Sequence, residues 1–121
     1  MKRPLNYFGL AFDEHMLKDK RQKEWKKQRK EKGFDNTELW NLDNTIAQFI
    51  FPRLKAFKEK TPKIPGNLTE QEWNKILEDM LYPFETIIQD NWYTKVPTKE
   101  ECKKFKKGLK LFSKYLMALW D

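Results

Sequence analysis

The sequence predicts an all-α fold, namely a small helical bundle of three long helices, two of them kinked at a proline, preceded by an N-terminal basic helix. Apolar residues recur at helical spacing in three separate segments of the chain. Two Thr-x-x-Glu capping boxes, at 69–72 and 98–101, directly precede two of those segments. Four Gly and one Ser leave little material for flexible linkers, so most of the chain is expected to be helical.

A chain of 121 residues predicts one domain, residues 1–121. A domain of this size buries about two-thirds of the surface that its unfolded chain exposes. Aromatic residues make up 15% of the sequence. Their large rings are expected to supply much of a small core.

The first predicted helix covers residues 13–32 and is strongly polar. Asp13 is a candidate N-cap, and Gly33 suits the position just after the helix. Few apolar residues occur in this segment, so most of its surface is expected to be solvated. They are Met16, Leu17 and Trp25.

Residues 34–42 are expected to form a turn, after which Asp43 caps a second helix that runs to about Lys60. An apolar stripe follows the helical period along it. It consists of Ile46, Phe49, Ile50, Leu54 and Phe57.

The third and last helices are expected to begin at Thr69 and Thr98. The stripe of the third is Trp73, Ile76, Leu77, Met80, Phe84 and Ile87. The stripe of the last is spaced at alternating intervals of four and three residues, which is typical of packing against a neighbouring helix or a second copy of the chain. It consists of Phe105, Leu109, Phe112, Leu116 and Leu119.

Pro52 and Pro83 fall inside the second and third helices. Each lacks the amide hydrogen that would bond the carbonyl four residues earlier, at a cost of about 3 kcal/mol that a kink usually relieves. One interpretation is that the kinks bend the helices around a small core. The other is that they open a concavity in which Arg53 and Lys55 meet a ligand.

The net charge of +7 is unevenly distributed. Residues 18–32 carry nine Lys or Arg against three acids, and residues 98–121 carry seven against three. Residues 33–97 carry seven against ten. A positive field of this kind favours an anionic partner, whether nucleic acid, nucleotide or an acidic protein surface.

Three segments, 39–59, 68–85 and 108–121, resemble a family of small tailed-bacteriophage proteins. The shared pattern is Trp-x-Leu-Asp, Pro-Arg-Leu-Lys-x-Phe-Lys, a Trp-bearing helix that closes on Phe-Glu, and a terminal Leu-Trp-Asp. The chain also resembles the phage anti-CBASS sponge proteins. That resemblance implies a non-enzymatic homo-oligomer in the host cytoplasm that sequesters cyclic dinucleotide immune signals.

A cyclic dinucleotide presents two phosphates and two flat bases. Arg53 and Lys55 are the candidate phosphate ligands, and Trp40 and Tyr93 are the candidates for stacking on the bases. Asn41 is a candidate for reading a base edge. Each has a structural alternative: an ion pair for Arg53, solvation for Lys55, and core packing for both aromatic residues.

The basic run at 18–32 supports an alternative function, a nucleic-acid-binding or host-protein-inhibiting phage accessory protein. Cations along one helix would neutralise phosphates without reading sequence, and Trp25 would stack on a base. No helix-turn-helix, zinc finger or RNP signature supports specific recognition. The candidate residues are Lys23, Trp25, Lys26, Lys27, Arg29 and Lys30.

An enzyme is not expected, because one His, one Cys and one Ser supply no nucleophile–base–orienter set. Glycine-rich phosphate loops are absent from the sequence. The acids Asp43, Glu78, Asp79 and Glu85 lack the paired spacing of a divalent-metal site. No cofactor, metal or membrane association is therefore expected.

Overall fold

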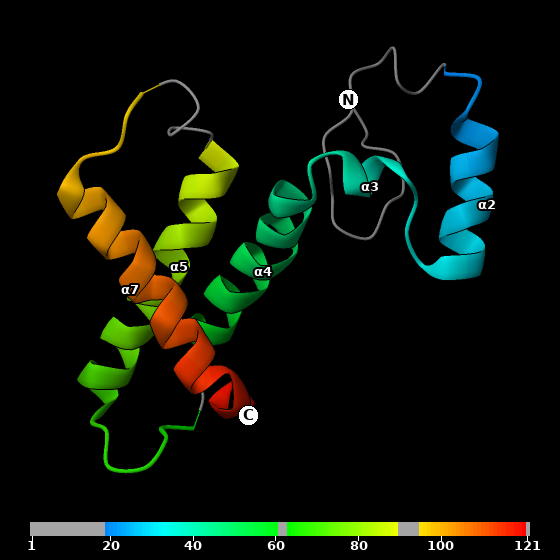
Figure 1. The fold of residues 1–121 in the computed structure, drawn as a ribbon. Coiled ribbons are helices and arrows are strands. Elements are labelled where there is room, and N and C mark those ends of the chain that lie inside the picture. Colours follow the sequence, from blue (N-terminus) through cyan, green and yellow to red (C-terminus); the bar gives the residue numbers. More distant parts are fainter. Residues whose placement is uncertain (1–18, 61–62, 90–94, 121) are drawn as a thin grey trace. The chain divides into compact units, whose positions relative to one another are not determined.

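The computed structural model describes residues 19–60, 63–89 and 95–120, and within these the chain is helical without strands. The predicted all-α class is confirmed. The predicted N-cap Asp13 lies outside the described residues. Along the chain the elements are α2 (Gln22–Lys32), α3 (Thr37–Trp40), α4 (Leu42–Glu59), α5 (Glu70–Gln89), α7 (Lys99–Tyr115) and the short 3-10 helix η1 (Leu116–Ala118) (Figure 1).

The chain forms two compact units, of which the first ends at Phe49 and the second begins at Ile50. Helix α4 contributes its first half to one unit and its second half to the other. The single domain expected over residues 1–121 stays a prediction.

Helix α2 in the first unit is a solvated helix held by one large side chain. Trp25 is its only buried residue. Gly33 ends the helix in the left-handed region at φ 87°, and its N–H donates to the carbonyl of Arg29 at 3.0 Å. Both the exposed character of this helix and the role of Gly33 were predicted and are confirmed.

A buried polar cluster follows α2, where a turn was expected. The carboxylate of Asp35 accepts hydrogen bonds from the N–H and hydroxyl of Thr37 and pairs with Arg29 at 2.5 Å. The carboxylate of Glu38 accepts the N–H of Asp35 at 2.8 Å. The Glu38 side chain thus accepts the Asp35 N–H, while the Asp35 carboxylate accepts the Thr37 N–H at the start of α3. The turn predicted at 34–42 was therefore wrong over Thr37–Trp40, which is helical.

The predicted N-cap at Asp43 was also wrong. Helix α4 begins at Leu42, so Asp43 lies in its first turn. Thr45 donates its N–H to the carbonyl of Asn41 at 3.0 Å and its hydroxyl to the carbonyl of Glu38 at 2.7 Å. Asp43 still places a negative charge at the positive end of the helix.

The core of the second unit gathers where α5 and α7 cross (Figure 1), with α4 adding Leu54 from its second half. Two edge-to-face ring pairs join α5 to α7. Trp73 meets Tyr115 with ring centroids 5.5 Å apart, and Phe84 meets Phe112 at 5.2 Å. The buried members of the core are Leu54, Trp73, Leu77 and Met80.

Both predicted capping boxes are confirmed. The hydroxyl of Thr69 accepts the N–H of Glu72 at 3.1 Å, and the carboxylate of Glu72 accepts the N–H of Thr69 at 2.9 Å. Thr98 and Glu101 repeat the arrangement at 3.1 and 2.9 Å. Each box satisfies two amides at a helix start that would otherwise lack partners.

Pro52 and Pro83 lie within continuous helices, α4 and α5. Their surroundings differ, because Pro52 is exposed and Pro83 is buried. The space beside Pro83 is filled by Gly108 of α7, whose Cα approaches the proline ring. Pro83 therefore marks a close contact between two helices, and the kinks expected at both prolines stay predictions.

The apolar stripe of the last helix is only partly covered. Phe105, Phe112 and Leu119 are half-buried, whereas Leu109 and Leu116 are 38% and 51% exposed. The described unit thus leaves part of the seam open. None of the helices in the described residues is long and apolar enough to cross a membrane.

Candidate ligand-binding pocket

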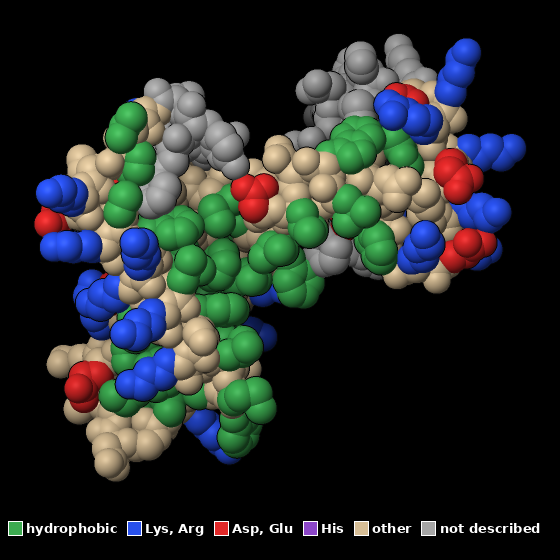
Figure 2. Space-filling model, viewed as in Figure 1, with side chains coloured by type: hydrophobic (Ala, Val, Ile, Leu, Met, Phe, Trp, Pro, Cys, Tyr) green, Lys and Arg blue, Asp and Glu red, His purple; other side chains and the backbone are tan. Residues whose placement is uncertain are grey.

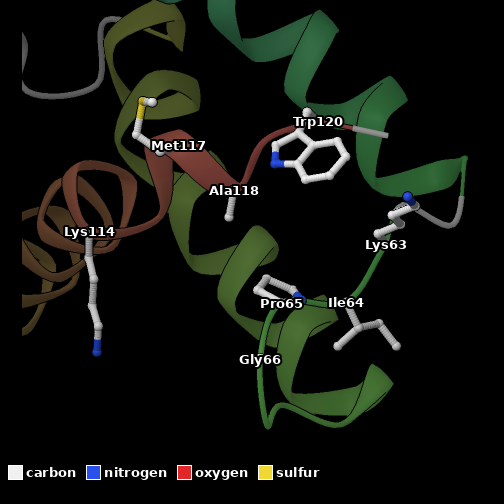
Figure 3. A pocket seen from close by; sticks show the side chains of 8 residues that line it. All are labelled: Lys63, Ile64, Pro65, Gly66, Lys114, Met117, Ala118 and Trp120. Carbon is white, nitrogen blue, oxygen red and sulfur yellow. The ribbon is translucent and has the colours of Figure 1, made fainter.

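A pocket of about 480 Å³ lies in the second unit, between the loop that precedes α5 and the end of the chain (Figure 3). Its volume falls within the range of small-molecule sites. Figure 3 shows Trp120 and Lys63 on one side, with Lys114 across from them. The lining residues are Lys63, Ile64, Pro65, Gly66, Lys114, Met117, Ala118 and Trp120.

Two irregular segments build this pocket. Gly66 adopts φ 53°, and the carbonyl of Pro65 accepts the N–H of Leu68 at 3.2 Å, so the loop turns tightly before α5. At the other end of the chain α7 gives way to η1, where Leu119 donates to the carbonyl of Leu116 at 3.2 Å. This tightened turn carries Trp120 to the 63–66 loop.

The pocket combines a flat aromatic surface with positive charge. The Nζ atom of Lys63 lies over the Trp120 ring, 5.0 Å from its centroid, within the range of a cation–π interaction. Lys114 adds a second ammonium from α7, with Nζ 5.2 Å from the ring centroid of Tyr115. None of the eight described lining residues is acidic. The site is therefore suited to an anion that also carries a flat ring.

The predicted phosphate ligands Arg53 and Lys55 lie on α4 in the second unit, and both are exposed. Neither lines the pocket described above. Their predicted role is not tested by this arrangement.

Trp40 and Asn41, the residues predicted to contact the bases, belong to the first unit. Trp40 is 55% exposed and packs edge-to-face with Trp25, with ring centroids 5.7 Å apart. The guanidinium of Arg21 lies 4.9 Å from the centroid of Trp25 and 5.4 Å from that of Trp40. Trp40 thus takes part in a local aromatic cluster while keeping an accessible face. Tyr93 lies outside the described residues.

The residues proposed for nucleic-acid binding divide into two groups. Trp25 is 3% exposed, and Arg29 pairs with the buried Asp35, so both are engaged within the first unit. The lysines at 23, 26, 27 and 30 are all exposed. On a helix of 3.6 residues per turn Lys23, Lys27 and Lys30 lie on the side opposite Trp25, and Lys26 lies on its flank. Figure 2 shows cationic side chains projecting from α2.

Sequence reasoning missed most of this pocket, because its residues come from segments about fifty positions apart and none carries a recognised motif. Trp120 belongs to the terminal Leu-Trp-Asp of the phage resemblance and was not among the candidate site residues. The turn signal in Pro65-Gly66 was the one sequence feature that pointed to this place.

No group of three or more His, Cys, Asp or Glu in the described part of the chain is arranged to hold a metal ion. Comparisons with protein-family models, with curated proteins and with solved structures find no match to this chain.

Proposed function

We propose that this chain is a phage-encoded, non-enzymatic binding protein that sequesters a cyclic dinucleotide immune signal in the host cytoplasm. The observation that carries the proposal is the pocket in which Lys63 and Lys114 lie on opposite sides and Trp120 forms a wall. The resemblance of the sequence to phage anti-CBASS sponge proteins supplies the ligand class.

The chemistry of the pocket fits such a ligand. Ammonium groups act as compact point charges for phosphates. A tryptophan face stacks on a base, and each such stack contributes about 1–3 kcal/mol where it has been measured on single strands. Two lysines and one indole therefore provide for two phosphates and one base. A second base would need another aromatic group, and the stacking roles of Trp40 and Tyr93 stay predictions.

The proposal includes self-association. Leu109 and Leu116, the open part of the predicted seam, are 38% and 51% exposed. A homo-oligomer would cover them and gather several pockets in one particle. The finer architecture expected from the sequence, a bundle of three long helices, two of them kinked at Pro52 and Pro83, plus an N-terminal basic helix, belongs to the same proposal.

Thermal melting against a panel of cyclic dinucleotides, linear nucleotides and short DNA tests this function. A ligand that binds the folded protein raises the melting midpoint by mass action. We expect one cyclic dinucleotide to raise it, and Trp120→Ala and Lys114→Gln to remove the shift. Arg53→Gln with Lys55→Gln tests the α4 residues in parallel.

Two results would overturn the proposal. One is a panel in which no cyclic dinucleotide shifts the midpoint. The other is recovery of linearised ligand after heat release from the complex, because a non-enzymatic binder returns its ligand intact.

A nucleic-acid-binding accessory protein is the second candidate function. The observation that favours it is the row of exposed lysines on the side of α2 opposite Trp25. Binding through that row would weaken steeply between about 50 and 200 mM salt, and Lys26→Gln with Lys30→Gln would weaken it further. An acidic host protein captured by the same row would instead survive nuclease treatment.

A further inference from the structure

Helix α7 carries a straight row of lysines that the core does not use and of which only the last lines the pocket. Lys99, Lys103, Lys106, Lys110 and Lys114 follow at intervals of four, three, four and four residues. At 100° per residue these positions stay on one side of the helix. All five are exposed, and Figure 2 shows Lys and Arg side chains gathered over α7. We call these five residues the lysine row.

The charge of this row is not balanced within the described residues. Lys107, next to the row, pairs with Asp79 at 3.5 Å. By contrast, no ion pair with a described residue is formed by Lys99, Lys103, Lys106 or Lys110. Like charges three and four residues apart on a helix repel one another. The lysines of the row therefore repel one another, and a bound polyanion would reduce that repulsion.

The row ends at the pocket, because Lys114 belongs to both. Its first and last Cα atoms are about 22 Å apart at 1.5 Å per residue, and neighbouring lysines are separated by about 4.5–6 Å along the axis. Phosphates along an extended nucleic-acid strand repeat at a comparable interval. Trp120, 60% exposed in the pocket, offers a ring on which a base can stack.

We propose that the lysine row and Trp120 together form a binding surface for single-stranded nucleic acid, with the backbone along α7 and a base in the pocket. This goes beyond the proposed function, because Lys103, Lys106 and Lys110 do not line the pocket. A nucleic-acid strand is favoured over an acidic protein or a membrane surface. A single row of positive charges that leads to the Trp120 ring matches a strand that carries phosphates along its backbone and bases at its side. Recognition would not depend on base sequence.

Fluorescence anisotropy with a short fluorescein-labelled oligothymidine tests the surface. The variant Lys103→Gln/Lys106→Gln/Lys110→Gln should bind the strand at least about tenfold more weakly at low salt. Its slope of log affinity against log salt should fall by about 2, since each phosphate contact on a single strand contributes about 0.7. Lys32→Gln/Lys60→Gln/Lys75→Gln, at three exposed positions outside α7 that are not binding candidates, removes the same charge and should change neither value appreciably.

The base contact has its own measurement. Wild-type protein should bind oligothymidine about tenfold more tightly than an abasic strand of equal length, and Trp120→Ala should abolish that preference. The triple α7 variant should retain the melting shift given by a cyclic dinucleotide, which separates this surface from the pocket's proposed ligand.

Three outcomes would overturn the proposed binding surface for single-stranded nucleic acid. The first is absence of oligothymidine binding at low salt. The second is an equal or greater loss in the Lys32/Lys60/Lys75 variant, which would show that binding responds to net charge alone. The third is binding to anionic phospholipid vesicles that the strand does not displace.

Discussion

Gly108 of α7 lies so close to Pro83 of α5 that a Cβ atom on residue 108 would come within 2.6 Å of the Pro83 Cδ atom. The same Cβ would also collide with the backbone carbonyl of Asp79. Pro83 has no N–H to donate to that carbonyl, so the carbonyl is left facing the neighbouring helix. Gly108, lacking a side chain, lets α7 approach it.

Gly108→Ala should therefore destabilise the protein although alanine is the better helix former. The helix propensity gained is about 1 kcal/mol, but the methyl group meets a rigid ring and a backbone oxygen, and overpacking of this kind costs about 1–3 kcal/mol. We expect a net loss in the free energy of unfolding, measured by urea denaturation followed by circular dichroism. Ser113→Ala, at an exposed position of α7, is the control and should be neutral or slightly stabilising.

The ion pair between Arg29 and Asp35 should be a principal support of the first unit. The side chain of Asp35 is fully buried and that of Arg29 is 11% exposed. Asp35→Ala leaves the guanidinium without its partner and removes the acceptor of two Thr37 bonds, so we expect a loss of about 3 kcal/mol. Lys58→Gln breaks the more exposed pair with Glu78 and should cost less than about 1 kcal/mol. Equal losses in the two variants would contradict this prediction.

Lowering the pH should change the stability contributions of Glu38 and Glu101 in opposite directions. Burial raises the pKa of Glu38 above its ordinary value of 4.5. The stability from its protonated form is therefore present below the unfolded pKa and lost as pH rises through the folded pKa. The hydrogen bond from the Thr98 backbone N–H lowers the pKa of Glu101. Its contribution is present above the unfolded pKa and lost as pH falls through the folded pKa.

Glu38→Gln and Glu101→Gln separate these effects. Relative to wild type, the Glu38 variant should gain in the free energy of unfolding between about pH 4 and pH 7, and the Glu101 variant should lose over the same range. Denaturation curves collected across that range measure both differences. If the free energy of unfolding of each variant differs from that of wild type by the same amount at every pH, neither carboxyl group has a different pKa in the folded and unfolded states.

The exposed part of the α7 seam should control self-association. Leu109→Asn with Leu116→Asn removes two apolar side chains that the described unit leaves 38% and 51% exposed. If a second copy covers the seam, light scattering after size exclusion should report a lower mass for the variant than for wild type. Val96→Asn is the control, since Val96 is 90% exposed and lies outside the seam. A monomeric wild type at all concentrations would rule out the homo-oligomer.

Short-range sequence signals predicted the helix ends well. Thr69, Thr98 and Gly33 act as expected because the hydrogen bonds that define a cap involve residues within four positions of one another. Asp43 was misassigned because the Asp35–Glu38 cluster starts the helical segment earlier and lets α4 begin at Leu42. The signal for α3 was present, since Asp35-Asn36-Thr37-Glu38 has the spacing of a capping box.

The candidate site was much less predictable. Arg53 and Lys55 were chosen because they follow a proline, but nothing local to α4 indicates which side chains share a cavity. Lys63 and Trp120 are brought together by the turn at Gly66 and the 3-10 turn at Leu116–Ala118. No periodic pattern specifies such a contact between irregular segments.

By itself, the sequence determined that this protein is helical, where its capped helices begin, and that its ends are strongly basic, because helix propensity, capping and charge are properties of neighbouring residues. Only the tertiary structure decided that Gly108 meets Pro83, that Arg29 is held by a buried Asp35, and that Trp120 closes a cationic pocket with Lys63. Those contacts depend on how closely distant segments can approach, which is set by side-chain volume and backbone geometry once the chain has packed.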